Sequence, residues 1–291
     1  MSITRRMIVV LALLTLFAVP VFASHSWGGY HWARTANPFT LKLHDNLDPI
    51  WEPYLSTAVS DWNQSTILDY NVQWQMPLSS QRRCASATGV VEICNEKYGQ
   101  NGWLGIAGIS ISGSHITKGY TKLNDTYFNM AQYNTPPWRQ MVTCQEIAHD
   151  FGLDHQDETF DNANLGSCMD YTNDPDGGAG GAVNNDPSNE HPNQHDYDEI
   201  SIIYQHLDST TTIASLSNIL SAMARPKTIN EIVSDVDDNL GIAVHFDQKG
   251  RPNVFVRPIA LNSNGELEME ITRVLWALEQ PGNSGAARGG E

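Results

Sequence analysis

Apolar and polar positions alternate along the first half of the chain in a pattern typical of a sheet with helices around it. Residues 39–44 alternate as a half-buried strand, and 50–62 place apolar side chains at helical spacing. We expect Asp48 and Pro49 to cap and start that helix. Further short strands are predicted at 70–74, 90–94, 104–111 and 116–123. A helix before the sheet is complete and another after it predict an α/β fold rather than an all-β sandwich.

The second half continues this mixture of helices and strands. Pro136 and Pro137 mark the start of a helix that we expect to stop at Gly152. Residues 172–194 are rich in Asn, Asp, Gly and Pro and predict a long loop. A second amphipathic helix is predicted from Asp196 to Leu207. Three more strands are predicted around 242–246, 253–259 and 267–276.

The first 23 residues have the pattern of an export signal. A positive Arg5-Arg6 pair precedes an apolar run, and the segment ends in Ala23, a small residue suited to signal peptidase. An uncleaved membrane anchor is the alternative. We therefore expect a signal peptide at 1–23 and a secreted, extracellular chain that no longer meets the membrane. We divide the remainder into a main domain at 24–208, a β-rich extension at 209–280 and a disordered tail at 281–291.

Composition adds a charge asymmetry to this picture. The 291 residues are 41% hydrophobic and 17% charged, which is typical of a globular protein, and the formal net charge is −16. No Lys or Arg occurs from Gln140 to Ala224, whereas Glu146 to Asp208 holds 15 of the 33 carboxylates. Such a concentration of negative charge disfavours nucleic acid as a partner and attracts metal ions or basic peptides.

One short stretch of the helix that starts at Pro136 carries candidate chemistry. Gln145 and His149 are one helical turn apart, so both side chains face the same way. Gly152 can take a left-handed conformation that turns the chain back and brings His155 beside His149. Glu146 would then lie beside a metal-bound water and could take its proton.

This spacing resembles that of the metzincin zinc peptidases, such as the matrixins and astacins, whose signature is H-E-x-x-H-x-x-G-x-x-H followed by a methionine turn. Glu146, His149, Gly152 and His155 match in register, and 167–171 looks like the methionine turn. The resemblance implies an α/β (α+β) fold with a mixed five-stranded twisted sheet, an active-site helix and a C-terminal helix. It also implies an edge strand at 104–107 that pairs with extended substrate.

The resemblance further implies a secreted zinc-dependent metalloendopeptidase with one catalytic Zn²⁺. In this interpretation the residues have the following roles: His149, His155 and Gln145 hold the metal, Glu146 is general base and then acid, Tyr171 stabilises the oxyanion, and Met169 forms the floor of the site.

Gln145 departs from the family pattern, because the first ligand is there a histidine. A carboxamide oxygen is neutral and binds zinc more weakly than an imidazole does. Three interpretations stay open: Gln145 is a genuine ligand, another residue completes the site, or the site has lost its activity.

Four cysteines in an exported chain predict two disulfides, and three pairings are conceivable. The resemblance implies the pair Cys144–Cys168, which leaves Cys84 and Cys94 as the other. The acids of the long loop are candidate Ca²⁺ ligands, although a solvated loop is the simpler interpretation: Asp174, Asp176, Asp186 and Glu190. His115, His191 and His195 are interpreted as surface residues.

We therefore expect a monomer that cleaves protein or peptide substrates, with a preference for basic side chains near the scissile bond. The chain between Ser24 and the first strand is too short for a folded pro-domain. One alternative is a catalytically inactive, secreted binding protein on the same fold. Another is an adhesion or envelope protein whose function lies in 209–280.

Overall fold

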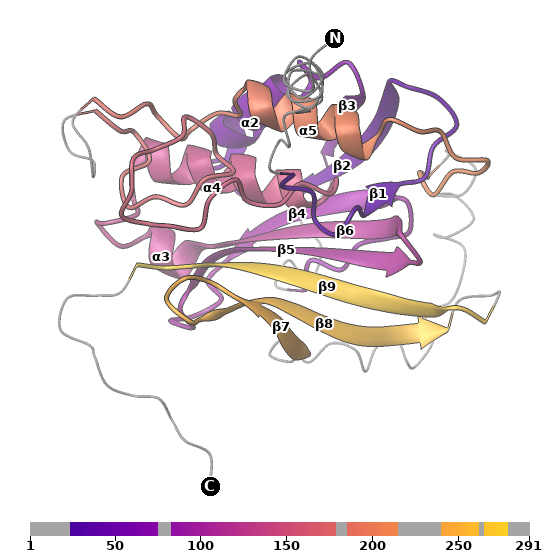
Figure 1. Cartoon of the computed structure of the whole chain (residues 1–291). Helices are drawn as coiled ribbons and strands as arrows, with labels where there is room; N and C mark the ends of the chain where they lie inside the picture. The colour runs from indigo at the N-terminus through magenta and orange to yellow at the C-terminus, as the bar shows by residue number, and fades with distance from the viewer. Residues whose placement is uncertain (1–23, 75–82, 179–184, 215–239, 262–264, 279–291) are drawn as a thin grey trace, which may run out of the picture.

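The computed structural model describes residues 24–74, 83–178, 185–214, 240–261 and 265–278. The predicted signal peptide and the predicted disordered tail lie outside these residues. The described chain has two layers: helices α2, α4 and α5 lie over one face of a single twisted sheet (Figure 1). The mixed α/β character expected from the sequence is confirmed.

The sheet contains nine strands among the described residues. They are β1 (His31–Trp32), β2 (Phe39–Asn46), β3 (Leu68–Trp74), β4 (Val90–Glu96), β5 (Trp103–Ser112), β6 (His115–Asn124), β7 (Ile242–Phe246), β8 (Pro252–Leu261) and β9 (Leu267–Trp276). Their order is β3-β2-β4-β6-β5-β9-β8-β7, and β1 pairs with β6 outside this path. Strands β3, β2, β4 and β6 are mutually parallel, whereas β5 runs antiparallel to β6.

The C-terminal strands extend this sheet instead of forming a layer of their own. Strand β9 pairs antiparallel with β5, β8 pairs with β9, and β7 closes the row (Figure 1). The expected edge strand at 104–107 is therefore wrong, because β5 has a neighbour on both sides. Its residues 103–111 are all buried, as is typical of an interior strand.

Two helix boundaries differ from the prediction. Helix α2 (Glu52–Trp62) begins after an N-cap at Trp51, not at Asp48 and Pro49, and Pro53 lies in its first turn. The carbonyl of Asp48 instead accepts a hydrogen bond of 2.9 Å from the Trp51 amide, which makes a turn before the helix. The buried face of α2 packs against α4 through Leu55, Ala58, Val59 and Trp62.

Helix α5 (Gln194–Ile203) also ends earlier than the predicted Leu207. Its start is fixed by a capping box between Asn193 and Asp196. At its end, the buried guanidinium of Arg34 donates to the carbonyls of Tyr204 and His206. These bonds satisfy carbonyls that follow the helix, so the chain can leave the helical path there.

Helix α4 (Pro136–His149) begins at the predicted proline and packs against α2 and against strands β5 and β6. All of its residues from Trp138 to His149 are buried, between α2 and the sheet. A short helix, α3 (Asp125–Phe128), follows β6 and was not predicted. No helix among the described residues is both long enough and apolar enough to cross a bilayer.

Candidate metal centre

The end of helix α4 brings two imidazoles together. Gly152 has φ +102°, and a Cβ there would collide with the carbonyl oxygen of Tyr30, so only glycine fits this turn. The chain reverses at Gly152 and returns His155 to the side of the helix. The Nε2 atoms of His149 and His155 are 3.0 Å apart, and their rings meet at an interplanar angle of 79°.

Both imidazoles are buried and their outer nitrogens are held by protein groups. Nδ1 of His149 lies 2.8 Å from the carbonyl oxygen of Leu153, to which it donates in the neutral tautomer that leaves Nε2 free. Burial lowers the pKa of His149 and of His155 well below their ordinary value, and neighbouring cationic groups act in the same direction. Neutral imidazoles with an available Nε2 lone pair are the form that binds metal.

Gln145 is buried one turn before His149. Its Nε2 donates a 2.7 Å hydrogen bond to the carbonyl of Cys168, and its Oε1 is buried without a hydrogen-bond partner among the described residues. A buried carbonyl-type oxygen without a partner costs free energy unless a further group satisfies it. The amide oxygen is therefore available to a ligand.

The turn at 167–171 is attached to this helix. The structure contains the disulfide Cys144–Cys168, as well as the second implied pair, Cys84–Cys94. Met169 is fully buried in the core next to this disulfide. Met169 therefore lies in the segment that supports Gln145.

Glu146 is completely buried, and neither of its carboxylate oxygens has a hydrogen-bond partner among the described residues. Burial raises the pKa of Glu146 well above its ordinary value, the negative charge of Asp150 raises it further, and Arg273 acts in the opposite direction. Gly105 of β5 makes room for this carboxylate, because a Cβ at that position would collide with Oε1.

Tyr171 packs against the second imidazole. Its ring centroid is 4.3 Å from that of His155 and 4.7 Å from that of Phe160. Burial raises the pKa of the Tyr171 hydroxyl, which therefore stays neutral and can donate a hydrogen bond.

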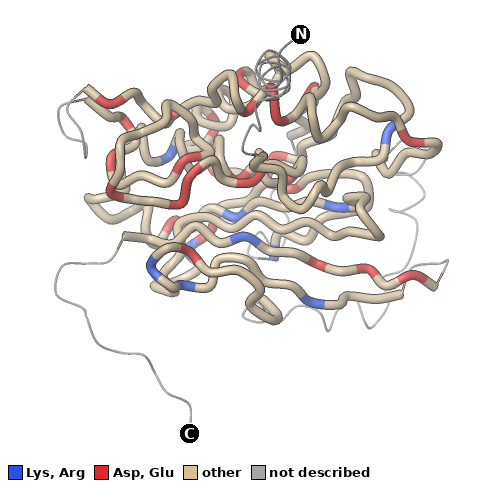
Figure 2. Tube along the Cα trace, in the orientation of Figure 1, with Lys and Arg blue, Asp and Glu red and all other residues tan. Residues whose placement is uncertain are grey.

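A buried arginine reaches the same site and was not predicted from the sequence. Arg273 of β9 places Nη1 2.9 Å from Nδ1 of His155 and 2.8 Å from Oε1 of Glu158, and it pairs with Asp154 through Nη2. The absence of Lys and Arg from 140–224 was an available signal, because buried carboxylates there need a cation from elsewhere. Figure 2 shows acidic positions gathered in the loops above the sheet, while basic positions lie mainly along the strands.

The described conformation closes the site. Ala107 of β5 lies opposite Arg273 of β9, and Gly105 lies opposite Leu275, so β9 covers the strand that the resemblance assigns to substrate. Glu146 is 0% and His149 1% exposed. A pocket beside His155 is lined by 154–158, by Arg273 and by residues of β7 and the turn after it.

The other candidate residues do not join this centre. The described loop carboxylates at 174, 176, 186 and 190 form no group of three that could share an ion, so calcium has no support there. His191 is exposed and bonds Asp61 at 2.7 Å, whereas His195 stacks on His25. His115 has a partly exposed side chain and belongs to a different cluster that is described below.

No family model and no curated protein matches this sequence. Several solved structures are similar to it, including the following two. One is High choriolytic enzyme 1 (HCE-1), a hatching enzyme zinc-protease from Oryzias latipes (Medaka fish), with a TM-score of 0.33 and 11% identity over 60% of this chain and 94% of that chain. The other is myroilysin, with a TM-score of 0.32 and 11% identity over 60% of this chain and 96% of that chain. Overlaps this low assign neither a fold family nor an activity to the chain.

Proposed function

We propose that this protein is an exported, zinc-dependent endopeptidase that the described conformation holds in a closed form. The observation that carries the proposal is the approach of two neutral imidazoles to 3.0 Å beside a buried carboxylate without a hydrogen-bond partner. Two disulfides support an oxidising, extracellular setting.

The available donors fit a zinc ion. His149 and His155 would each supply Nε2, and Gln145 would supply the amide oxygen that has no other partner. When bound, zinc would supply Lewis acidity that polarises a peptide carbonyl and acidifies a water molecule. The hydrogen bond from Gln145 to Cys168 would fix the direction of the amide, as outer partners do for metal ligands.

The chain's own groups would handle the proton and the substrate. Glu146 would take a proton from the attacking water and give it to the leaving amine, and its burial favours the protonated form that follows the first transfer. The neutral hydroxyl of Tyr171 would donate to the developing oxyanion. Met169 would support the site from the core side.

Substrate would have to replace β9. An extended peptide that pairs with β5 needs the same backbone groups that β9 now occupies. Strands β9, β8 and β7 form one end of the strand order, so they could leave without interrupting the other strands. Arg273 also indicates specificity: Asp154 and Glu158 already bind an arginine, which supports a preference for basic side chains in substrates.

The closed conformation equally favours a second candidate, a non-catalytic binding protein. If β9 never leaves β5, the two histidines and Glu146 have no access to a peptide. Gln145 in place of a stronger ligand is consistent with this alternative.

One experiment separates the two candidates. A cleavage site for a specific protease is introduced within 215–239, and the purified mature chain is assayed on fluorogenic peptide libraries before and after cutting and after separation of the C-terminal piece. The proposal expects chelator-sensitive hydrolysis after separation, strongest for peptides with Arg or Lys, and hydrolysis about 10²–10⁴-fold slower in the Glu146→Gln variant. Absence of hydrolysis after separation, with zinc bound and the fold intact by circular dichroism, would establish the binding protein instead.

A further inference from the structure

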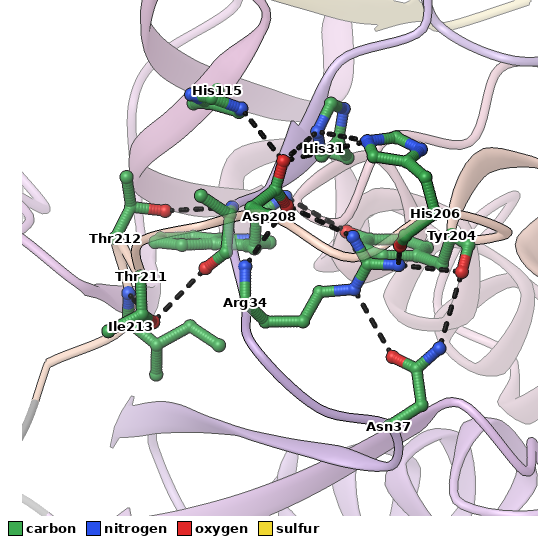
Figure 3. Close-up of polar contacts among 12 residues, drawn as sticks. His31, Arg34, Asn37, His115, Tyr204, His206, Asp208, Thr211, Thr212 and Ile213 are labelled. Carbon is green, nitrogen blue, oxygen red and sulfur yellow. Dashed lines mark hydrogen bonds and ion pairs between the residues drawn. The ribbon is translucent and has the colours of Figure 1, made fainter.

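A second group of histidines gathers on the side of the sheet where β1 meets β6. His31 comes from β1, His115 from the start of β6, and His206 and Asp208 from the segment that follows α5 (Figure 3). Asp208 Oδ1 is 3.2 Å from His115 Nε2, 3.6 Å from His206 Nε2 and 3.7 Å from His31 Nε2. The Nε2 atoms of His31 and His206 are 3.1 Å apart. Three imidazoles thus point one nitrogen each at the same carboxylate oxygen.

Four of the six separations among these ligand atoms are close to those of a tetrahedral zinc site. With bonds of about 2.0–2.1 Å, neighbouring ligand atoms around tetrahedral zinc lie about 3.3–3.5 Å apart. The separations given above, from 3.1 to 3.7 Å, bracket that value. The ligand atoms of His31, His115 and Asp208 lie within 4.8 Å of one another. His206 is not part of this group, so its half-exposed side chain would have to turn towards His115 to complete a tetrahedral shell.

Hydrogen bonds to neighbouring groups orient two of the four side chains, Asp208 and His31, for such a role. Asp208 uses its other oxygen, Oδ2, to accept from the side chain of Arg34 at 3.1 Å and from its backbone amide at 3.2 Å, which leaves Oδ1 facing the imidazoles. Nδ1 of His31 lies 2.9 Å from the carbonyl of Gly29. Donation to that carbonyl fixes the tautomer in which the His31 Nε2 lone pair points at Asp208.

Arg34 makes this arrangement rigid. Its buried guanidinium also binds Asn37 at 3.2 Å and the carbonyl of Tyr204 at 2.6 Å (Figure 3). The Asp208 amide in turn donates to the Arg34 carbonyl at 2.9 Å. The carboxylate and the backbone of 206–208 are therefore positioned without help from a metal.

We propose that His31, His115, His206 and Asp208 form a second, structural site for a divalent metal that prefers imidazole ligands, with Zn²⁺ as the expected ion. Four protein ligands complete a tetrahedral shell and leave no open position for a water or a substrate, so the role is structural. The ion would tie the segment after α5 and strand β1 to the β5–β6 hairpin. None of the four residues belongs to the centre at His149 and His155, so the two sites are independent.

The proposal is tested by counting zinc on the mature full-length chain, using equilibrium dialysis against Zn²⁺ and metal analysis. His206→Ala and His115→Ala are expected to lower the stoichiometry by one ion, or to weaken that ion at least tenfold. His191→Ala is the matched control, because it removes an imidazole bonded to Asp61 and should change nothing. A double variant, His149→Ala with His155→Ala, should retain the ion that His206→Ala loses.

The outcomes separate this inference from the proposed function. A single ion that survives the double variant and disappears in His206→Ala would support the second site and count against the peptidase centre. Full stoichiometry and affinity in both His206→Ala and His115→Ala would overturn the second site and leave the peptidase untouched. Co²⁺ absorption provides a second reading of the ligand geometry: a tetrahedral cobalt spectrum should remain in the double variant. The melting temperatures of wild type and His206→Ala provide the last reading. If the difference between them changes with pH but not with added Zn²⁺, the four side chains share protons and not a metal ion, and the metal site is overturned.

Discussion

Arg273 and His155 are in direct contact, with Nη1 of the arginine 2.9 Å from Nδ1 of the imidazole. If the guanidinium donates to Nδ1, the imidazole proton must be on Nε2, the nitrogen that faces His149. Zinc needs the opposite tautomer, in which Nδ1–H is donated to Glu158 at 3.1 Å and Nε2 is free. The arginine of the last described strand therefore competes with metal binding.

Replacing this arginine should favour the metal. Arg273→Met keeps much of the volume but removes the cation next to His155, and we expect zinc to bind about tenfold more tightly at the His149–His155 centre, about 1.4 kcal/mol. Competition with a fluorescent chelator measures this affinity. Arg257→Met is the control, because it breaks the Arg257–Glu270 ion pair on β8 and β9 away from the histidines. Weaker zinc binding in Arg273→Met would show that the arginine supports the site.

Glu146→Gln should separate catalysis from stability. The amide cannot accept the water's proton, so hydrolysis by the opened protein should fall by about 10²–10⁴-fold while zinc remains bound. In the metal-free protein the variant should be more stable than wild type at pH 8, because a buried carboxylate with a raised pKa loses stability as pH rises above its unfolded pKa. Urea unfolding at pH 5 and pH 8 measures the difference, with Glu96→Gln as control. If the variant and the wild type have the same free energy of unfolding at both pH values, the described burial of Glu146 is contradicted.

Gln145→His tests whether the amide is a ligand. An imidazole at this position restores a stronger donor, so zinc affinity should rise at least tenfold if Gln145 contributes its Oε1 to the metal. Gln145→Ala should lower it. If neither substitution changes the affinity, Gln145 only supports Cys168 through its hydrogen bond, and another group completes the site.

Asp170 provides a pH prediction outside the metal centres. Burial raises its pKa to about 7, although hydrogen bonds from Leu165 and Asn189 act in the opposite direction. The folded state therefore holds this proton more tightly than the unfolded state, in which the pKa is near the model-compound value of about 3.9. The contribution of Asp170 to stability is complete below about pH 4 and is lost as pH rises to about 7.

Asp170→Asn should remove this dependence. The melting temperature of the variant relative to wild type should rise between pH 4 and pH 7 and stay constant above that range. Asp198→Asn, at an exposed position on α5, is the control. A difference between variant and wild type that does not change with pH would mean that Asp170 ionises normally in the folded chain.

The sequence predicted the local features of this fold well. Alternation located β2, and Pro136 located the start of α4, because both signals depend on neighbouring residues. Gly152 also adopts the predicted left-handed conformation, which brings His149 and His155 together. The local pattern therefore contained most of the information about this histidine pair.

The features that the sequence did not predict depend on distant contacts. The pairing of β9 with β5 joins strands with most of the chain between them, and no local pattern specifies that partner. Arg273 could not be placed at His155 before this pairing was known. Nothing in the sequence connected His115 with His31 and Asp208, because these partners come from opposite ends of the first 208 residues.

The late position of β9 also has a consequence for biosynthesis. While the nascent chain is still lacking 267–276, β5 is complete but exposes a long row of unpaired amides and carbonyls between apolar side chains. Such an edge readily joins other chains. Molecules truncated before the last strand should therefore associate through β5 as their concentration rises, and the C-terminal strands would protect every newly made copy from its neighbours.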